Sequence, residues 1–447
     1  MSSLGPTDWI VQVNESLDSE FLPSDGQLYW EKRSIYKVRS SITDLNRKAY
    51  QPQVVSFGPY HHGEEHLLPM EHHKHRALHR FLKQSGKRLE PFLNSLSEVR
   101  QALEKSYEAL DSNWKQCSSE GAAFRFLKLM ITDGCFMLEI LRTARQKGTQ
   151  VKQEITQENG YMVNDPIFSD HGKLHIMPYI KRDMLMLENQ LPMLVLEQLV
   201  AVESDHKEGH DCINRLILDF FSSALSEDIG KCLHVLDVYR KSVLLPDKHE
   251  QNKPKKKPNE DKPNNALRTE IIRSATELHE HGIRLRKSKT SSLKDISFDN
   301  GVLSLPRIIV DDIFESVYLN LIVFEHFHVG AGDEVTSYVF LMDKIINDEK
   351  DVALLHTKGI IENAIGSDKA IAEMFNSLCK EVTLRPESSL DAVHTGVSTY
   401  CKRTWYKWRA TLRHTYFKSP WSIISFIAAI LLFALAIIQT AYAMIYH

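Results

Sequence analysis

The sequence lacks the short motifs that mark common catalytic and redox chemistries. Its six cysteines include no pair at CxxC spacing, which argues against a zinc ribbon or a thioredoxin-type centre, and they are too few in 447 residues for a disulfide scaffold. HExxH, P-loop, GxSxG and protein-kinase motifs are all missing, and the glycine pair at 330–332 lacks the third glycine of a dinucleotide fingerprint. We therefore predict no metal, no cofactor and no catalytic residues.

Charge of one sign is also lacking. The net charge is -3, which gives no overall attraction to nucleic acid, and we expect no nucleic-acid partner. The N-terminus has no basic segment followed by an apolar one, so no secretory signal peptide is indicated. The lack of a signal peptide favours a body that lies in the cytosol.

The chain does contain one long apolar run, at its C-terminus. Residues 423–445 carry no Asp, Glu, Lys or Arg. At about 1.5 Å per helical residue they would span roughly 34 Å, enough to cross a hydrocarbon core of about 30 Å. Trp421 precedes the run, and Tyr442 and Tyr446 lie near its end, as expected for residues at the membrane interface. We predict a single transmembrane helix over 420–446; the alternative is a buried core helix.

Basic residues precede this segment and are scarce after it. They are Lys402, Arg403, Lys407, Arg409, Arg413 and Lys418. Under the positive-inside rule this distribution places the large N-terminal part in the cytosol, as in a tail-anchored protein. It does not indicate which membrane is the target. Basic residues near aromatic ones can also bind single-stranded nucleic acid, but beside a membrane span anionic lipid is the simpler partner.

The remaining pattern predicts a mainly α (α+β) fold. We expect a multi-helix body, a small antiparallel sheet in the second half and the C-terminal transmembrane helix. The sheet is indicated by short apolar runs on either side of Asn300-Gly301, a strong hairpin turn. The expected parts are a helical N-terminal lobe at 30–245, a Lys/Pro-rich flexible loop at 246–266, a C-terminal lobe with hairpin and helices at 267–385, a basic juxtamembrane helix at 386–419 and the transmembrane helix at 420–446.

A histidine-rich stretch lies near the start of the first lobe. The apolar run at 53–57 before Gly58 predicts a strand entering a turn, and a helix follows from about residue 69. Ala77 and Phe81 fall on the apolar face of this helix and Lys74 falls largely off it. His75 and His79 are four residues apart and could chelate a divalent metal, although a solvated polar face is the simpler interpretation.

Several acidic residues fall within apolar surroundings. Residues 122–145 predict a central buried helix pair, interrupted where Asp133 could cap a helix and Gly134 could mark a break or a close contact. Glu139 needs a partner such as an arginine. Around Asp183 and Glu188 the density of polar groups predicts a buried network that fixes a helix–helix corner, with a catalytic carboxylate pair as the alternative.

Ordered blocks along the chain carry a resemblance to a known family. They are Val54–Pro59, His61–Gly63, Asp133–Phe136, Leu187–Pro192, Ala275–Leu278, Asn320–Glu325, Gly359–Ile361, Phe375–Asn376 and Pro420–Trp421. Through these blocks, over roughly residues 30 to 446, the chain resembles the plant domain of unknown function 247 family, which includes UPF0481-type membrane-anchored proteins. The resemblance implies a plant protein with a largely helical body, a C-terminal anchor and no established activity or cofactor.

Together these features predict a membrane-tethered plant interaction or recognition protein. Its expected partners are membrane lipid, through the C-terminal helix, and a protein whose identity the sequence leaves open. The alternative is a membrane-bound enzyme whose site is assembled from dispersed residues, namely His61, His62, Asp133 and Glu188. A third possibility is a lipid-binding adaptor for which the C-terminal helix is redundant.

Overall fold

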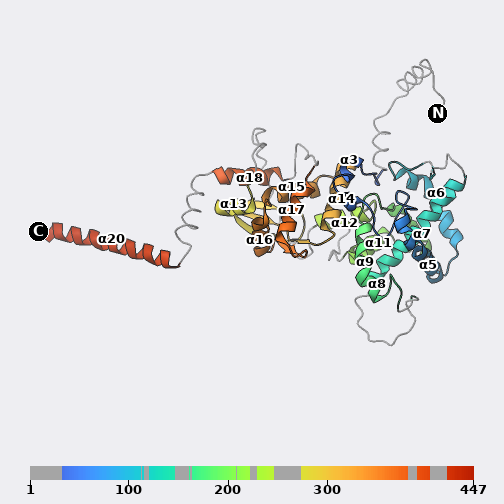
Figure 1. Cartoon of the computed structure of the whole chain (residues 1–447), viewed down its shortest axis with the longest axis horizontal. Helices are drawn as coiled ribbons and strands as arrows, with labels where there is room; N and C mark the ends of the chain where they lie inside the picture. The colour runs from blue at the N-terminus through green and yellow to red at the C-terminus, as the bar shows by residue number, and fades with distance from the viewer. Residues whose placement is uncertain are drawn as a thin grey trace, which may run out of the picture. The chain divides into compact units, whose positions relative to one another are not determined.

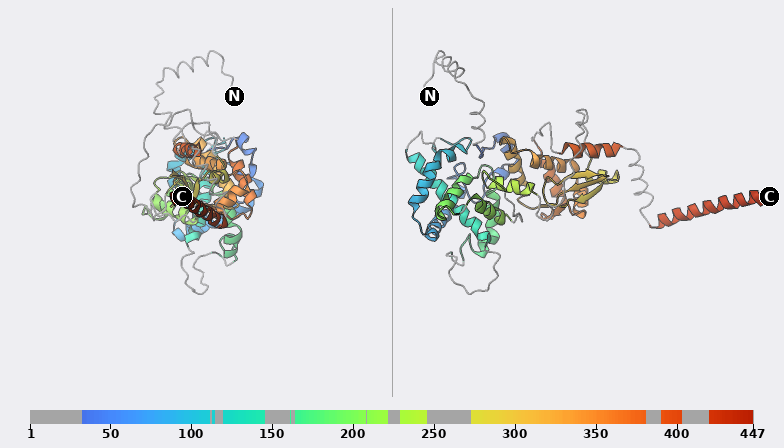
Figure 2. Two further views of the ribbon diagram at one scale, coloured as in Figure 1. Left: turned by 90° about the vertical axis from the view of Figure 1, so that its left-hand side faces the viewer. Right: turned by 180° about the vertical axis from the view of Figure 1, so that it is seen from behind.

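A computed structural model shows a mainly helical protein with a small sheet in its second half (Figures 1 and 2). It describes residues 33–111, 113–114, 120–145, 161, 164–207, 209–221, 229–245, 273–380, 390–402 and 420–446. The chain divides into two compact units. The first consists of residues 1–249 and 313–336, and the second of residues 250–312 and 337–447.

The first unit is built from helices. They are α3 (Ser40–Thr43), α4 (Arg47–Tyr50), η1 (Glu65–Leu67), α5 (Leu68–Ser85), α6 (Leu89–Lys105), α7 (Glu120–Arg145), α8 (Asp170–His175), α9 (Met177–Asp183), α10 (Met193–Glu203), α11 (His210–Phe220), α12 (Val235–Leu244) and α14 (Phe314–Phe327). The central element is α7, which packs against α5, α6, α10 and α11 (Figure 1). All its residues from 129 to 141 are buried, so α7 forms the core of this unit.

The prediction of two helices over 122–145 was wrong, because α7 runs through Asp133 and Gly134 without a break. A lysine from α5 neutralises the charge of Asp133, so the carboxylate is satisfied in the middle of the helix and does not act as a cap. A Cβ atom on Gly134 would lie 2.6 Å from Leu199 Cδ1 and 2.9 Å from Val195 Cγ1 of α10. Of the two roles considered for Gly134, close packing is therefore the one observed.

The strand predicted at 53–57 is also absent, since this described segment has no regular secondary structure. Its backbone N–H groups donate to side chains instead of a neighbouring strand. Those of residues 53–55 donate to Asp183, that of Phe57 donates to Asn189 Oδ1 at 2.6 Å, and that of Gly58 donates to Asp133 Oδ2 at 2.8 Å. Buried amides are thus satisfied without a sheet, which an apolar run alone does not reveal.

The second unit contains the strands and the remaining helices. These elements are α13 (Ala275–Glu280), β1 (Arg284–Lys287), β2 (Ser297–Asp299), β3 (Val302–Leu305), β4 (Ile308–Val310), α15 (Glu334–Ile345, whose first residues belong to the first unit), α16 (Glu349–Thr357), β5 (Ile361–Asn363), α17 (Asp368–Leu378), α18 (Asp391–Lys402) and α20 (Pro420–Tyr446).

The expected hairpin is confirmed. Strands β2 and β3 pair antiparallel across Asn300 and Gly301, which both have positive φ, as a tight hairpin turn requires. Strand β1 adds to β3 in parallel and makes the sheet mixed, while β4 and β5 form a separate parallel pair. A Cβ atom on Gly301 would lie 2.5 Å from the Tyr400 hydroxyl oxygen, so this turn also requires glycine for space.

Candidate functional site

The C-terminal helix α20 is long and apolar enough to cross a membrane. Its 27 residues correspond to about 40 Å of helix, and residues 424–442 have a mean hydropathy of 2.4 with none of their side chains buried. Such a surface is not that of the core helix considered as the alternative, which would be covered by other elements. Tyr442 is 62% exposed, whereas Trp421 and Tyr446 are placed only by their positions near the two ends of the helix.

The basic residues that precede α20 are described only in part. Lys402 occupies the last turn of α18 and is exposed. The other five, Arg403, Lys407, Arg409, Arg413 and Lys418, lie outside the described residues. Their predicted contact with anionic lipid therefore stays a prediction.

Of the four residues named for a dispersed active site, two lie together. His61 is buried between two carboxylates, with Nδ1 2.7 Å from Glu64 Oε1 and Nε2 3.2 Å from Glu188 Oε2. Burial acts to lower the pKa of His61, but the hydrogen bonds and charges of Glu188 and Glu64 outweigh it, so the pKa is raised. Glu188 Oε1 also accepts the backbone N–H of Val38 at 2.5 Å.

The other two residues are engaged elsewhere. The ring of His62 packs edge-on against Trp114, with 5.5 Å between ring centroids. Asp133 is completely buried, and its Oδ1 lies 2.8 Å from Nζ of Lys74, which is itself completely buried. Lys74 also contacts Glu71 Oε1 at 2.6 Å and Ser56 Oγ at 3.2 Å. The four residues therefore do not converge on one site.

Lys74 is the main residue that sequence reasoning misplaced. The spacing of apolar residues placed it largely off the apolar face of α5, and this agreed with the rarity of fully buried lysines. In the structure it is buried with Ala77 and Phe81, because Asp133 and Glu71 balance its charge. Burial raises the pKa of Asp133, and the Lys74 charge limits that rise. This arrangement is a structural ion cluster, in which one lysine balances two carboxylates.

The polar network at the corner between α9 and α10 is confirmed. Asp183 accepts N–H groups from residues 53–55, and Asn189 Nδ2 donates at 2.9 Å to the carbonyl oxygens of Val55 and Asp183. Gln190 closes the corner by donating at 2.7 Å to the carbonyl oxygens of Met184 and Met186. The carboxylates of Asp183 and Glu188 serve different backbone segments, which is the arrangement of a structural network.

Two further expectations concern partners for polar groups. Glu139 is 4% exposed and lies 2.9 Å from Arg80 Nε, so the expected arginine partner is found. His75 and His79 are both exposed on α5. No group of three or more His, Cys, Asp or Glu residues able to hold a metal occurs among the residues that the structure describes.

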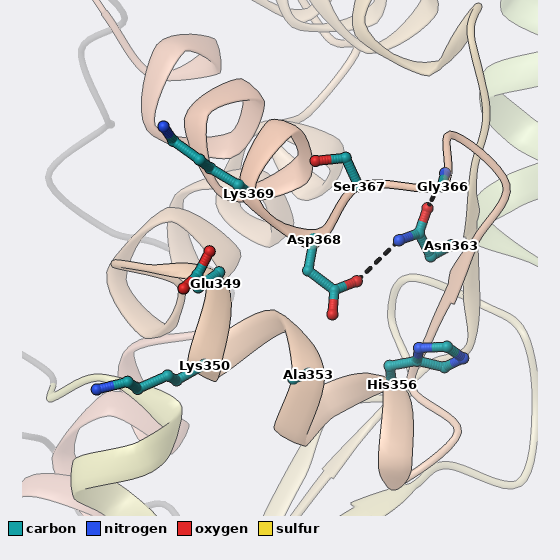
Figure 3. Close-up of a pocket in the computed structure, with 9 residues that line it drawn as sticks. All are labelled: Glu349, Lys350, Ala353, His356, Asn363, Gly366, Ser367, Asp368 and Lys369. Atoms are coloured by element: carbon teal, nitrogen blue, oxygen red, sulfur yellow. Dashed lines mark hydrogen bonds between the residues drawn. The ribbon is translucent and has the colours of Figure 1, made fainter.

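A surface groove in the second unit has a volume of about 690 Å³ (Figure 3). It is bounded by α16, β5 and the start of α17. In Figure 3 Asp368 points toward Asn363, whose Nδ2 donates to Asp368 Oδ1 at 2.8 Å, while Asn363 Oδ1 accepts the Gly366 N–H at 2.7 Å. These groups satisfy one another, and the remaining charged residues of the groove, Glu349, Lys350 and Lys369, are of mixed sign.

A second cavity, of about 500 Å³, lies in the first unit. Its lining residues are Lys37, Val38, Arg39, Ser40, Thr43, Arg47, Tyr50, Gln51, His61 and Glu188. It is the place where the His61–Glu188 pair meets a group of cations. The sequence offered little signal for this cavity, because its parts are more than a hundred residues apart and the cations are scattered singly through residues 37–47.

Comparison with known proteins identifies the family. The family described as "plant protein of unknown function", DUF247, matches residues 35–435. A UPF0481 protein of Arabidopsis thaliana is 32% identical over 446 residues, covering 93% of this chain and 87% of its own length. A second UPF0481 protein of the same plant is 23% identical, covering 97% and 94%. No solved structure matches the chain. The protein belongs to this plant family of unknown function.

Proposed function

We propose that the protein is a single-pass, tail-anchored membrane protein that acts by binding a partner rather than by catalysis. The observation that carries the proposal is α20, whose apolar side chains from 424 to 442 are all exposed. Burying this surface in lipid removes it from water, at about 25 cal/mol for each Å² of apolar area. The gain is large enough that insertion into a bilayer is favoured over exposure.

The charge distribution around α20 supports an orientation. Six basic residues lie between 402 and 418, and after residue 420 no lysine or arginine occurs. Each basic side chain near an anionic leaflet contributes about 1 kcal/mol. Under this proposal the body, residues 1–419, faces the cytosol and the C-terminus faces the lumen or the exterior.

Binding is favoured over catalysis because the candidate catalytic residues are dispersed. His61 and Glu188 meet, but the charge of Asp133 is neutralised by Lys74, and His62 packs on Trp114. The body that α20 would hold at the membrane presents a groove of about 690 Å³ in the second unit and a cavity of about 500 Å³ in the first. A recognition role fits this arrangement better than an assembled active site does.

Membrane extraction tests the anchor. Full-length protein should stay in the pellet after an alkaline carbonate wash, and a chain ending at residue 419 should move to the supernatant. A matched control replaces 420–446 by an unrelated apolar helix of equal length, which should restore the pellet. Release of the full-length chain by carbonate, or retention of the truncated chain, contradicts the proposal; retention alone would favour the lipid-binding adaptor.

Orientation and partner require separate assays. In intact microsomes added protease should digest the body. Asn14 begins an Asn-Glu-Ser glycosylation sequon and should carry no glycan. Protection of the body from protease, or a glycan on Asn14, would contradict the proposed orientation. Proximity labelling in plant cells, compared between the native helix and the replacement helix, should label the same proteins if the body does the binding. The control is the helix 420–446 without residues 1–419. If the full-length chain labels no protein beyond those labelled by this control, the proposed interaction role is refuted.

A further inference from the structure

The cavity in the first unit has the size of a small-molecule site. Its volume of about 500 Å³ falls within the range of about 300–1,000 Å³ found for ligand pockets. All its lining residues belong to the first unit, so its geometry does not depend on the placement of the second. Any ligand must match the charges and polar groups of these residues.

The backbone around the cavity is held by buried polar contacts from the turn between α9 and α10 and from α14. The N–H of Val38 donates to Glu188 at 2.5 Å. The carbonyl of Ala49 accepts from Ser316 Oγ at 2.8 Å and from Asn320 Nδ2 at 2.9 Å, both on α14. The backbone between residues 38 and 49 is thereby fixed near both ends, which lowers the backbone entropy lost on binding.

Three cations line the cavity, Lys37 just before this segment and Arg39 and Arg47 within it; the Lys37 backbone N–H donates to Glu108 Oε2 at 3.3 Å. Lys37, Arg39 and Arg47 are exposed, and none forms an ion pair with any residue that the structure describes. The Arg39 guanidinium lies 5.5 Å from the centroid of the Phe327 ring, a cation–π contact that restricts its position. Arginine and lysine grouped in this way are the usual ligands of phosphate, which accepts their N–H groups through several oxygens.

The buried part of the lining calls for a different chemical group. Glu188 is 9% exposed, and its carboxylate repels a phosphate but accepts a hydrogen bond from a hydroxyl group. Thr43 and Gln51, both half-buried, can donate to and accept from hydroxyl oxygens. A ligand that satisfies both parts carries phosphate where the cations lie and hydroxyl groups toward Glu188.

We propose that this cavity binds a phosphorylated polyol, with its phosphate on Lys37, Arg39 and Arg47 and a hydroxyl on Glu188. The same chemistry occurs in a free sugar or inositol phosphate and in the headgroup of a phosphoinositide lipid. The inference does not rest on membrane anchoring, because the lining residues are independent of α20.

Calorimetric titration of the full-length chain in phosphatidylcholine nanodiscs tests the proposal. Inositol trisphosphate should bind, whereas inositol alone and inorganic phosphate should bind at least about tenfold more weakly, since each lacks one of the two groups. The variants Arg39→Gln and Arg47→Gln should each weaken inositol trisphosphate binding about tenfold or more, because a lost charge-assisted hydrogen bond costs roughly that factor. Equal affinity for inorganic phosphate overturns the polyol part of the proposal.

The matched control is Lys48→Gln. Lys48 is exposed, follows Arg47 in α4 and is not part of the cavity lining, so its loss should leave binding unchanged. If Lys48→Gln weakened ligand binding as much as the two arginine variants do, the effect would come from the overall positive charge, and the proposed site would be refuted. Addition of phosphatidylinositol bisphosphate to the nanodiscs distinguishes the sources: competition with the soluble ligand indicates the lipid headgroup, and unchanged binding indicates the free phosphate. Absence of binding by every probe refutes the proposal and leaves the anchor proposal untouched.

Discussion

Replacement of the buried lysine of α5 should destabilise the first unit strongly. In Lys74→Met the chain loses the cation that lies 2.8 Å from the fully buried carboxylate of Asp133. Glu71, the other anionic partner, has 22% of its side chain exposed and can be rehydrated, but Asp133 cannot. Removing one member of a buried ion pair typically costs about 3–5 kcal/mol. We expect a loss of that size in the free energy of unfolding.

Hydrogen exchange followed by mass spectrometry localises this effect. Since about 1.4 kcal/mol corresponds to a factor of ten, a loss of about 3–5 kcal/mol should lower the protection of α7 amides in Lys74→Met by roughly 10²- to 4 × 10³-fold. The matched control is Lys83→Met in the same helix, where the lysine is exposed and the change should stay within about 0.5 kcal/mol. Adding Asp133→Asn should recover part of the loss, because the amide keeps an acceptor for Gly58 and buries no charge. Equal protection in the Lys74 and Lys83 variants would refute the reasoning.

Two further substitutions test the packing of the first unit. His234 is fully buried and caps α12, and burial lowers its pKa from 6.5 to about 4. The free energy of unfolding should therefore fall by about 3 kcal/mol as the pH falls from 6.5 to about 4, because the unfolded chain binds the proton first. In urea unfolding, His234→Asn, which keeps a cap, should remove this part of the pH dependence. Gly134→Ala should lower the free energy of unfolding by about 1–2 kcal/mol, because overpacking against Leu199 and Val195 outweighs the gain in helix propensity. A thermal unfolding midpoint equal to or above that of the native chain would contradict this prediction.

Local signals predicted several elements of the fold. The apolar run at 423–445 needs only composition and length to indicate α20, and the hairpin at Asn300-Gly301 follows from the positive φ that these residues tolerate. The polar network around Asp183 and Asn189 was predicted because so many hydrogen-bonding groups in an apolar stretch require partners. In each case the information lies within the feature itself.

The features that were missed depend on partners far along the chain. Asp133 and Gly134 indicate a helix break by local preference, but Lys74, 59 positions earlier, neutralises the carboxylate and α10 packs against the glycine. The cavity requires His61 and Glu188 to meet the cations of residues 37–47. No periodicity links such positions, so one sequence without its fold cannot predict them.

The irregular segment at 53–58 connects these long-range contacts. Its backbone amides donate to Asp133 of α7, to Asp183 at the end of α9 and to Asn189 in the turn that follows α9. A buried ion such as Asp133 adds little net stability compared with apolar packing, but it favours one arrangement of the backbone over others, because any other arrangement leaves its charge unsatisfied. The segment leads directly to His61, which lines the cavity with Glu188. Loss of the Lys74–Asp133 pair should therefore weaken ligand binding in the cavity, even though neither residue lines it.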